Sequence, residues 1–148
     1  MVITKKLELQ TRGNNDTHNI TEAVAQVVRE SAQSGVVTLF CPSSTSGLTT
    51  IEFEPGAVAD LKRAFDELIP AGREYRHNER WGDGNGHSHI RASLLGPSLT
   101  VPFVNGQLML GTWQQIIFVD FDIRSRQREI IVQIVGEGVG EGVGEGAG

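Results

Sequence analysis

Three histidines, His77, His87 and His89, fall within thirteen residues of one another in the most polar part of the sequence. This spacing would let one ordered loop present several imidazoles to a single point. Three neutral imidazoles with a fourth position left open form the ligand set of one kind of catalytic zinc site. Asp83, between them, could ligate the metal or orient one of the histidines. The pattern predicts a metal site, with chance placement of exposed histidines on a polar loop as the alternative.

A second polar segment runs from Pro42 to Thr49, between two predicted strands. Hydroxyl side chains and backbone N–H groups gathered in a tight turn can hold an oxyanion. The segment lacks the Gly-Lys-Ser/Thr ending of a nucleotide-binding phosphate loop. Cys41, which precedes it, is expected to be a small core residue. The candidate anion-binding residues are Ser43, Ser44, Thr45, Ser46 and Gly47, and the alternative is a polar turn without a ligand.

Arginines concentrate around the histidines, at Arg73, Arg76, Arg80 and Arg91. Their guanidinium groups are suited to phosphate, although ordinary pairing with the acidic residues between them is the alternative. Glu52 lies in an apolar strand pattern, where a carboxylate is solvated, paired or perturbed for acid–base work.

Hydrophobic patterns predict the elements that would position these residues. Strands are expected over residues 3–9, 36–41, 48–53, 98–104, 107–110, 115–121 and 129–135, and helices over 20–31, 55–68 and 87–95. The first strand is expected at a sheet edge and the second buried on both faces, with Gly35 as a left-handed helix cap before it. Asn19 and Glu22 have capping-box spacing at the first helix. Asn105-Gly106 predicts a type I′ turn, and the last two strands are expected to pair as a hairpin. The predicted class is α+β, a single compact domain with about three helices.

The composition separates the chain into a body and a tail. The 148 residues carry a net charge of −5, from 13 basic and 18 acidic side chains. Three of the acids lie in residues 136–148, so the body is left with 13 basic against 15 acidic residues, a net charge of −2. We predict one domain over residues 1–135 and a flexible, glycine- and glutamate-rich extension over 136–148.

The same composition excludes several classes of protein. No apolar run approaches the ~18 residues needed to span a membrane, and the first residues do not read as a signal peptide. A single cysteine fits a reducing cytoplasm, and a nearly neutral body offers no electrostatic reason to expect nucleic acid. We therefore expect a cytoplasmic protein that binds neither membranes nor nucleic acid.

Three segments together resemble the YjbQ family, whose members are often described as secondary thiamine-phosphate synthase-like. These segments are Pro42-Ser-Ser-Thr-Ser-Gly-Leu-Thr-Thr-Ile-Glu, then His77 with Asp83-Gly-Asn-Gly-His-Ser-His-Ile-Arg-Ala-Ser-Leu-Leu-Gly-Pro-Ser, and Asn105-Gly-Gln-Leu-Met-Leu-Gly-Thr-Trp-Gln-Gln. The resemblance extends from about Lys5 to Gly136.

The resemblance implies a compact α+β fold on a mixed, mainly antiparallel sheet, assembled as a homotrimer with the site near a subunit interface. His77 and His89 match the family's paired histidines, Arg91 its basic position after them, and Glu52 its acid in the strand. The loop over 43–47 matches the family's hydroxyl loop. Many members carry histidine at position 43 and aspartate at position 87, so this chain has exchanged a histidine between the two segments.

Three functions remain open at this stage. The first is weak thiamine-phosphate synthase-like transfer, with a divalent metal, for which zinc is a candidate, on His77, His87 and His89. In that reading Arg91 and the 43–47 loop contact phosphate, and Glu52 orients the substrate or transfers a proton. The second is a metal-assisted phosphohydrolase acting on a small phosphorylated metabolite. The third is a non-enzymatic trimeric ligand-binding or scaffold protein.

Overall fold

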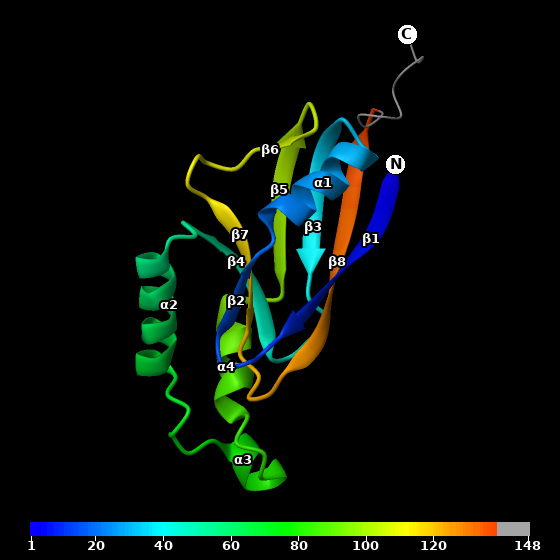
Figure 1. Cartoon of the computed structure of the whole chain (residues 1–148). Coiled ribbons are helices and arrows are strands. Elements are labelled where there is room, and N and C mark those ends of the chain that lie inside the picture. The colour runs from blue at the N-terminus through cyan, green and yellow to red at the C-terminus, as the bar shows by residue number, and fades with distance from the viewer. Residues whose placement is uncertain (139–148) are drawn as a thin grey trace.

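The computed structural model describes residues 1–138 of the chain. Its strands are β1 (Val2–Thr11), β2 (Asp16–Asn19), β3 (Ser34–Phe40), β4 (Ser46–Ile51), β5 (Ser98–Val104), β6 (Gln107–Leu108), β7 (Gln115–Asp120) and β8 (Arg126–Glu137). Its helices are α1 (Thr21–Ser31), α2 (Pro55–Leu68), α3 (Arg76–Trp81) and α4 (Gly86–Leu95). These elements confirm the predicted α+β class (Figure 1).

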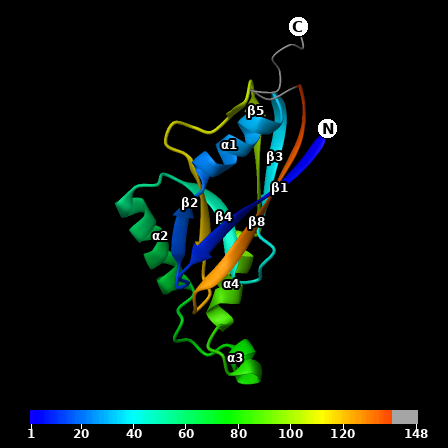
Figure 2. The ribbon, with the colours of Figure 1, turned by 45° about the vertical axis from the view of Figure 1, so that its right-hand side comes forward.

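Two antiparallel sheets organise the fold. The larger has the strand order β1-β8-β3-β5-β6, and the smaller has the order β2-β7-β4. The turn around 12–15 carries the chain from β1 in the larger sheet to β2 in the smaller one (Figure 2). All of the strand pairs within residues 1–138 are antiparallel, so the sheets are not mixed.

The strand that is buried on both sides is β7, which separates two hydrophobic cores. Ile116 and Phe118 face the larger core, which α1 covers with Val24 and Val28. Ile117 and its neighbours on the other face of β7 pack under α2 and α4. The prediction that 36–41 is buried on both faces is wrong, because only alternate residues of β3 are buried and Phe40 is 42% exposed.

The outer face of the larger sheet remains open in a single chain. The register places Val2, Val135 and Val36 in one row across β1, β8 and β3, and Phe40 lies further along β3. All four side chains are at least 38% exposed. We call these four residues the outer face. A row of exposed branched residues on a sheet surface is typical of a surface that another chain covers.

The predicted hairpin between 115–121 and 129–135 is wrong. β7 pairs with β2 and β4, whereas β8 pairs with β1 and β3, so the two strands belong to different sheets. The loop between them, residues 121–125, crosses from one sheet to the other. Local alternation indicates a strand but not its partner, which explains the error.

Local signals at turns and helix ends had mixed outcomes. The expected type I′ turn is confirmed, since Asn105 and Gly106 have φ values of 53° and 73° and join β5 to β6. The expected capping box at Asn19 is formed only in part: the N-cap of α1 is Ile20, but Oδ1 of Asn19 accepts from the Thr21 N–H at 3.1 Å, at the first residue of the helix. The expected helix cap at Gly35 is wrong, because Gly35 lies inside β3. An added Cβ at this position of the strand would collide with the carbonyl oxygen of Val135.

Strand β8 extends past the predicted domain boundary at residue 135. Gly136 and Glu137 pair with Gly35 and Ser34, so the sheet continues two residues beyond position 135. Residues 139–148 of the predicted flexible extension lie outside the described part of the chain. Within residues 1–138, none of the helices has both the length and the apolar character needed to cross a membrane.

Candidate functional site

His77 and His89 face each other at the end of the molecule formed by α3 and α4. Their ring centroids are 4.4 Å apart, and both residues are half-buried. Gly86 allows this approach, because a Cβ there would collide with the side chain of Tyr75, just before α3. The Gly86 N–H also donates to Oδ1 of Asn78, at 2.8 Å, and so fixes the start of α4 against α3. The predicted histidine pair is therefore brought together.

Asp83 lies beside one ring of this pair without a hydrogen bond to it. Its Oδ1 lies 3.3 Å from Nδ1 of His77, and both side chains are partly exposed. Asp83 lies in the turn between α3 and α4, where Gly82 and Gly84 take positive φ values of 63° and 67°. The carboxylate therefore lies on the Nδ1 side of the ring, and Nε2 points away from it.

His87 lies apart from the pair. Its side chain is buried, and its ring is 6.4 Å from that of Tyr75, between centroids. Burial, followed by the charge of Arg91, lowers the pKa of the His87 imidazole, so the ring is neutral. Residues two apart on a helix point to different sides, which is why α4 cannot direct His87 and His89 to one point.

A three-imidazole site is not assembled within one chain. Among residues 1–138, no three or more histidine, cysteine, aspartate or glutamate side chains form a group that could hold a metal ion. The described chain contributes two imidazoles and one carboxylate to this corner, and a complete metal site would need further ligands.

The hydroxyl loop faces inward. Thr45 donates its hydroxyl to Oδ2 of Asp122 at 3.0 Å and accepts from Nη2 of Arg128 at 2.8 Å. Ser46 is buried, and Gly47 packs so closely under the end of α4 that a Cβ would lie 2.9 Å from the Gly96 carbonyl oxygen. Ser43 is half-buried and Ser44 exposed. Most of the predicted anion loop therefore supports the fold.

The partners of Thr45 belong to a buried charged cluster that sequence reasoning missed. Arg128 holds Asp120 with two bonds, from Nε at 2.7 Å and from Nη2 at 3.1 Å. Asp122 lies 3.3 Å from Arg126 and 3.5 Å from Arg128. We call Asp120, Asp122, Arg128 and Thr45 the buried cluster. The alternation of arginines at 126 and 128 along β8 was the signal that could have revealed it.

Electrostatics within the buried cluster favour the charged forms of Asp122 and Arg128. Burial raises the pKa of Asp122, but the Thr45 hydroxyl and Arg126 outweigh burial, so the net shift is downward. Burial likewise opposes ionisation of Arg128, yet the hydrogen bond and charge of Asp120 raise its pKa. Buried charges that are paired and hydrogen-bonded in this way stabilise one arrangement of the chain.

Arg91 and Glu52 lie away from the histidine pair. Arg91 is buried, and its guanidinium donates to Asn15, Asp66 and the carbonyl of Ile69 at 2.7–3.1 Å. Those contacts tie α4 to α2 and to the turn before β2. Glu52 is exposed just after β4, at the opposite end of that strand from Ser46 and Gly47. Within one chain, neither Arg91 nor Glu52 contributes its side chain to the histidine pair.

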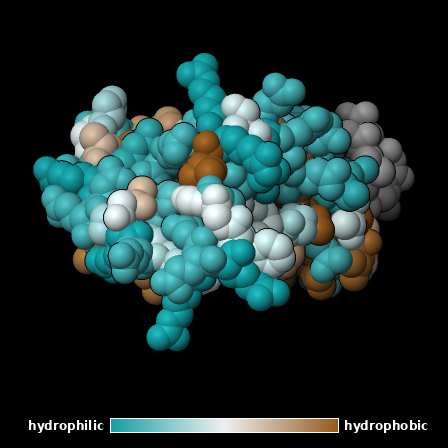
Figure 3. Space-filling model, turned by 90° about the horizontal axis from the view of Figure 1, so that it is seen from below, coloured by the Kyte–Doolittle hydropathy of each residue, from teal (hydrophilic) through white to brown (hydrophobic). Residues whose placement is uncertain are grey.

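The exposed arginines near the histidines are not engaged in ion pairs within the described residues. Arg73, Arg76 and Arg80 are exposed and make no ion pair within residues 1–138, contrary to the alternative of ordinary surface pairing. Arg80 lies 5.5 Å above the ring of Trp81. Seen from this end, the surface of the molecule is mostly hydrophilic (Figure 3). The corner therefore offers positive charge to an anionic ligand.

These features define a small α+β protein of two antiparallel sheets with a histidine pair at one end. The chain belongs to the YjbQ family: the family model described as UPF0047 protein YjbQ-like matches residues 5–137. This finding confirms the resemblance inferred from the motifs.

Relatives and solved structures agree with this assignment. The chain is 36% identical over 128 residues to a UPF0047 protein of Archaeoglobus fulgidus, covering 86% of this chain and 98% of the relative. It is 34% identical over 134 residues to the UPF0047 protein YugU of Bacillus subtilis, covering 89% and 98%. A YbjQ-like protein of unknown function from Sulfolobus solfataricus P2 has a TM-score of 0.87 at 31% identity, over 93% of this chain and 99% of that one.

Proposed function

We propose that this member of the YjbQ family is a cytoplasmic, metal-dependent enzyme with weak thiamine-phosphate synthase-like transferase activity on small phosphorylated substrates. The observation that carries the proposal is the contact between the rings of His77 and His89, with Asp83 beside Nδ1 of His77. Two adjacent imidazoles with a carboxylate beside one of them are a suitable start for a divalent metal site such as zinc.

The chemistry assigned to the site follows from its charges. Joining a pyrimidine-methyl diphosphate to a thiazole phosphate releases pyrophosphate, and the departing negative charge must be stabilised. A bound divalent metal would supply Lewis acidity there. Arg76 and Arg80 on α3, which are exposed and make no ion pair within residues 1–138, would bind the phosphate oxygens.

Self-association as a homotrimer is part of the proposal. The outer face leaves Val2, Val36, Phe40 and Val135 exposed on the side of the larger sheet that α1 does not cover, which favours burial against another copy. A neighbouring copy could also bring ligands such as Glu52 to the histidine pair. Light scattering in solution should give the mass of three chains, and a monomer would contradict this part.

The decisive assay measures thiamine-phosphate formation by the purified protein with zinc, magnesium or manganese added. We expect slow turnover that chelation abolishes and that His77→Ala with His89→Ala removes. His18→Ala is the matched control, because His18 pairs with Asp16 on β2 and not with the histidine pair. No product with any metal would refute the transferase.

Two further measurements distinguish the other two candidate functions. Release of inorganic phosphate from a panel of phosphorylated metabolites, sensitive to chelation, would identify a phosphohydrolase. Binding of metal without consumption of any substrate, accompanied by a lower melting temperature on chelation, would identify a ligand-binding or scaffold protein.

A further inference from the structure

Asn78, which follows His77 on α3, closes both ends of the turn that joins α3 to α4. Its backbone carbonyl accepts from the N–H of Gly82 at 2.7 Å, where α3 ends. Its side-chain Oδ1 accepts from the N–H of Gly86 at 2.8 Å, where α4 begins. A single residue therefore holds the two helix ends at a fixed distance from each other.

These two bonds lie next to both histidines of the pair. His77 directly precedes Asn78, and His89 follows Gly86 by three residues. Residues three apart lie on the same side of a helix, so His89 projects from the side of α4 on which Gly86 lies. The position of Gly86 relative to Asn78 therefore sets how near the two rings come, with their centroids 4.4 Å apart.

The rings themselves are not held by hydrogen bonds within residues 1–138. Asp83 lies 3.3 Å from Nδ1 of His77 without satisfying it, and His89 contributes its backbone carbonyl but not its ring. In the same part of the chain, no hydrogen bond joins α3 to α4 besides the one between Asn78 and Gly86. That bond is the directional contact which keeps the helices, and with them the rings, together.

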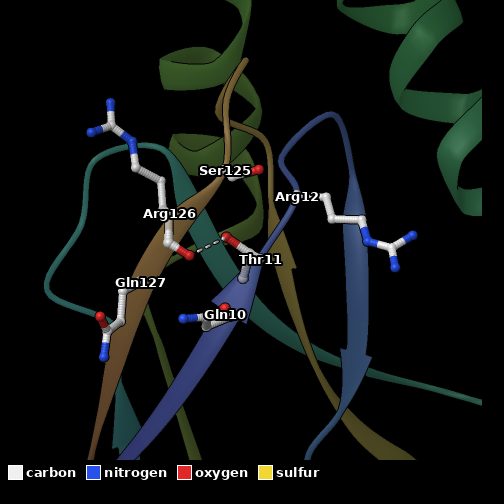
Figure 4. A pocket seen from close by; sticks show the side chains of 6 residues that line it. All are labelled: Gln10, Thr11, Arg12, Ser125, Arg126 and Gln127. Carbon is white, nitrogen blue, oxygen red and sulfur yellow. Dashed lines mark hydrogen bonds between the residues drawn. The ribbon is translucent and has the colours of Figure 1, made fainter.

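The polar side chains where β1 meets β8 lack such an arrangement. Figure 4 shows the guanidinium groups of Arg12 and Arg126 directed away from one another. Gln10 pairs with Gln127 on the exposed face of the two strands, opposite to the face that carries Thr11 and Arg126. Polar residues that are close in the fold thus form a site only where the backbone directs them to one point.

We infer that Asn78 is a positioning residue of the histidine pair: its Oδ1 fixes the separation of the two imidazoles and so determines how tightly they bind a divalent metal. The inference rests on the metal binding proposed for His77 and His89. Asn78 is not assigned as a ligand, because its Oδ1 already accepts from Gly86. Mutation of groups that orient metal-binding histidines typically lowers metal affinity by 10–100-fold.

Zinc titration of the full chain, in competition with a chromophoric chelator of known affinity, measures this effect. We expect Asn78→Ala to bind zinc at least about tenfold more weakly than the wild type, because α4 loses its bond to α3. Asn78→Asp keeps an acceptor oxygen for the Gly86 N–H and should bind at least as tightly as the wild type. Ser93→Ala is the matched control, since it removes a 2.8 Å bond to the His89 carbonyl within α4 and should leave the affinity unchanged.

A measurement on the metal-free protein separates this inference from the proposed function. Ring protons of His77 and His89 should show a nuclear Overhauser cross-peak in the wild type, Asn78→Asp and Ser93→Ala, and Asn78→Ala should lose it. A wild type with the cross-peak but without zinc binding would contradict the proposed metal site and the effect on affinity, and the cross-peak would still decide the positioning role. Asn78→Ala that keeps the cross-peak, or that binds zinc as Ser93→Ala does, would overturn the inference.

Discussion

The buried cluster and the histidine pair use polar side chains in opposite ways. In the buried cluster, Arg128 and Asp120 satisfy each other within 3.1 Å and are almost fully removed from solvent. In the histidine pair, two half-buried rings face each other, and Asp83 contacts only one of their nitrogens. Side chains whose donors and acceptors are bonded within the protein hold the fold, whereas side chains with free atoms beside solvent are available for chemistry.

The strongest test of this contrast replaces Arg128 by methionine. Asp120 and Asp122 would lose a buried cation, and removing one partner of a buried ion pair costs about 3–5 kcal/mol. We expect a loss of that size in the free energy of unfolding measured with urea at neutral pH. Arg29→Met is the control, because Arg29 pairs with Glu22 at 2.9 Å on the exposed side of α1 and should cost under about 1 kcal/mol. Equal losses would show that the cluster is not structural.

Thr45→Val tests the hydroxyl loop at nearly constant volume. The variant removes the bond to Asp122 and the acceptor for Arg128, and unsatisfied buried partners cost about 1–3 kcal/mol. Thr38→Val is the matched control, since the Thr38 hydroxyl bonds only Thr100 on the sheet surface, at 3.1 Å. If Thr45→Val unfolds at the same urea concentration as the control, the loop is free for another role.

The pH dependence of stability should report on His87. Burial lowers the pKa of its imidazole below the ordinary value of 6.5, so the unfolded chain binds a proton more readily than the folded one. Stability is therefore complete above that value and falls as the pH is lowered from about 7 toward 5. Urea unfolding of His87→Gln across this window should show a flatter profile than the wild type. An unchanged profile would assign the dependence to another group.

The smallest effect on stability is expected at the histidine pair. His77→Ala combined with His89→Ala should change the free energy of unfolding by no more than about 1 kcal/mol, because both rings are partly exposed. Addition of zinc should raise the melting temperature of the wild type and not that of the double variant. A loss comparable with that of Arg128→Met would place the pair among the structural groups.

Local features of the chain were predicted well from sequence. Pro55 begins α2 and Leu68 ends it, as the periodicity indicated, and the Asn105-Gly106 turn forms the expected hairpin. These features depend on neighbours in the sequence, where capping, turn chemistry and helical period act. The spacing predicted that His77, His87 and His89 would meet at one point, and only the rings of His77 and His89 do so.

Long-range partnerships could not be predicted in the same way. Whether β8 pairs with β7 or with β1 depends on the whole topology, and the alternation of side chains is the same in either case. Thr45 looked like an anion-binding hydroxyl because its partners, Asp122 and Arg128, lie about 80 residues away. α3 was missed because its six residues carry no apolar stripe and four of them are exposed.

The close packing at Gly136 has a consequence for any shortened form of the protein. Gly136 begins the glycine–glutamate repeat, yet its carbonyl accepts from the Met1 ammonium group at 3.2 Å and a Cβ on it would lie 2.5 Å from the Ser34 carbonyl oxygen. The first glycine of the repeat is thus a sheet residue that joins both ends of the described chain. Trimming the repeat at residue 135 would cut into the domain, whereas trimming after residue 138 would leave every rung of β8 in place.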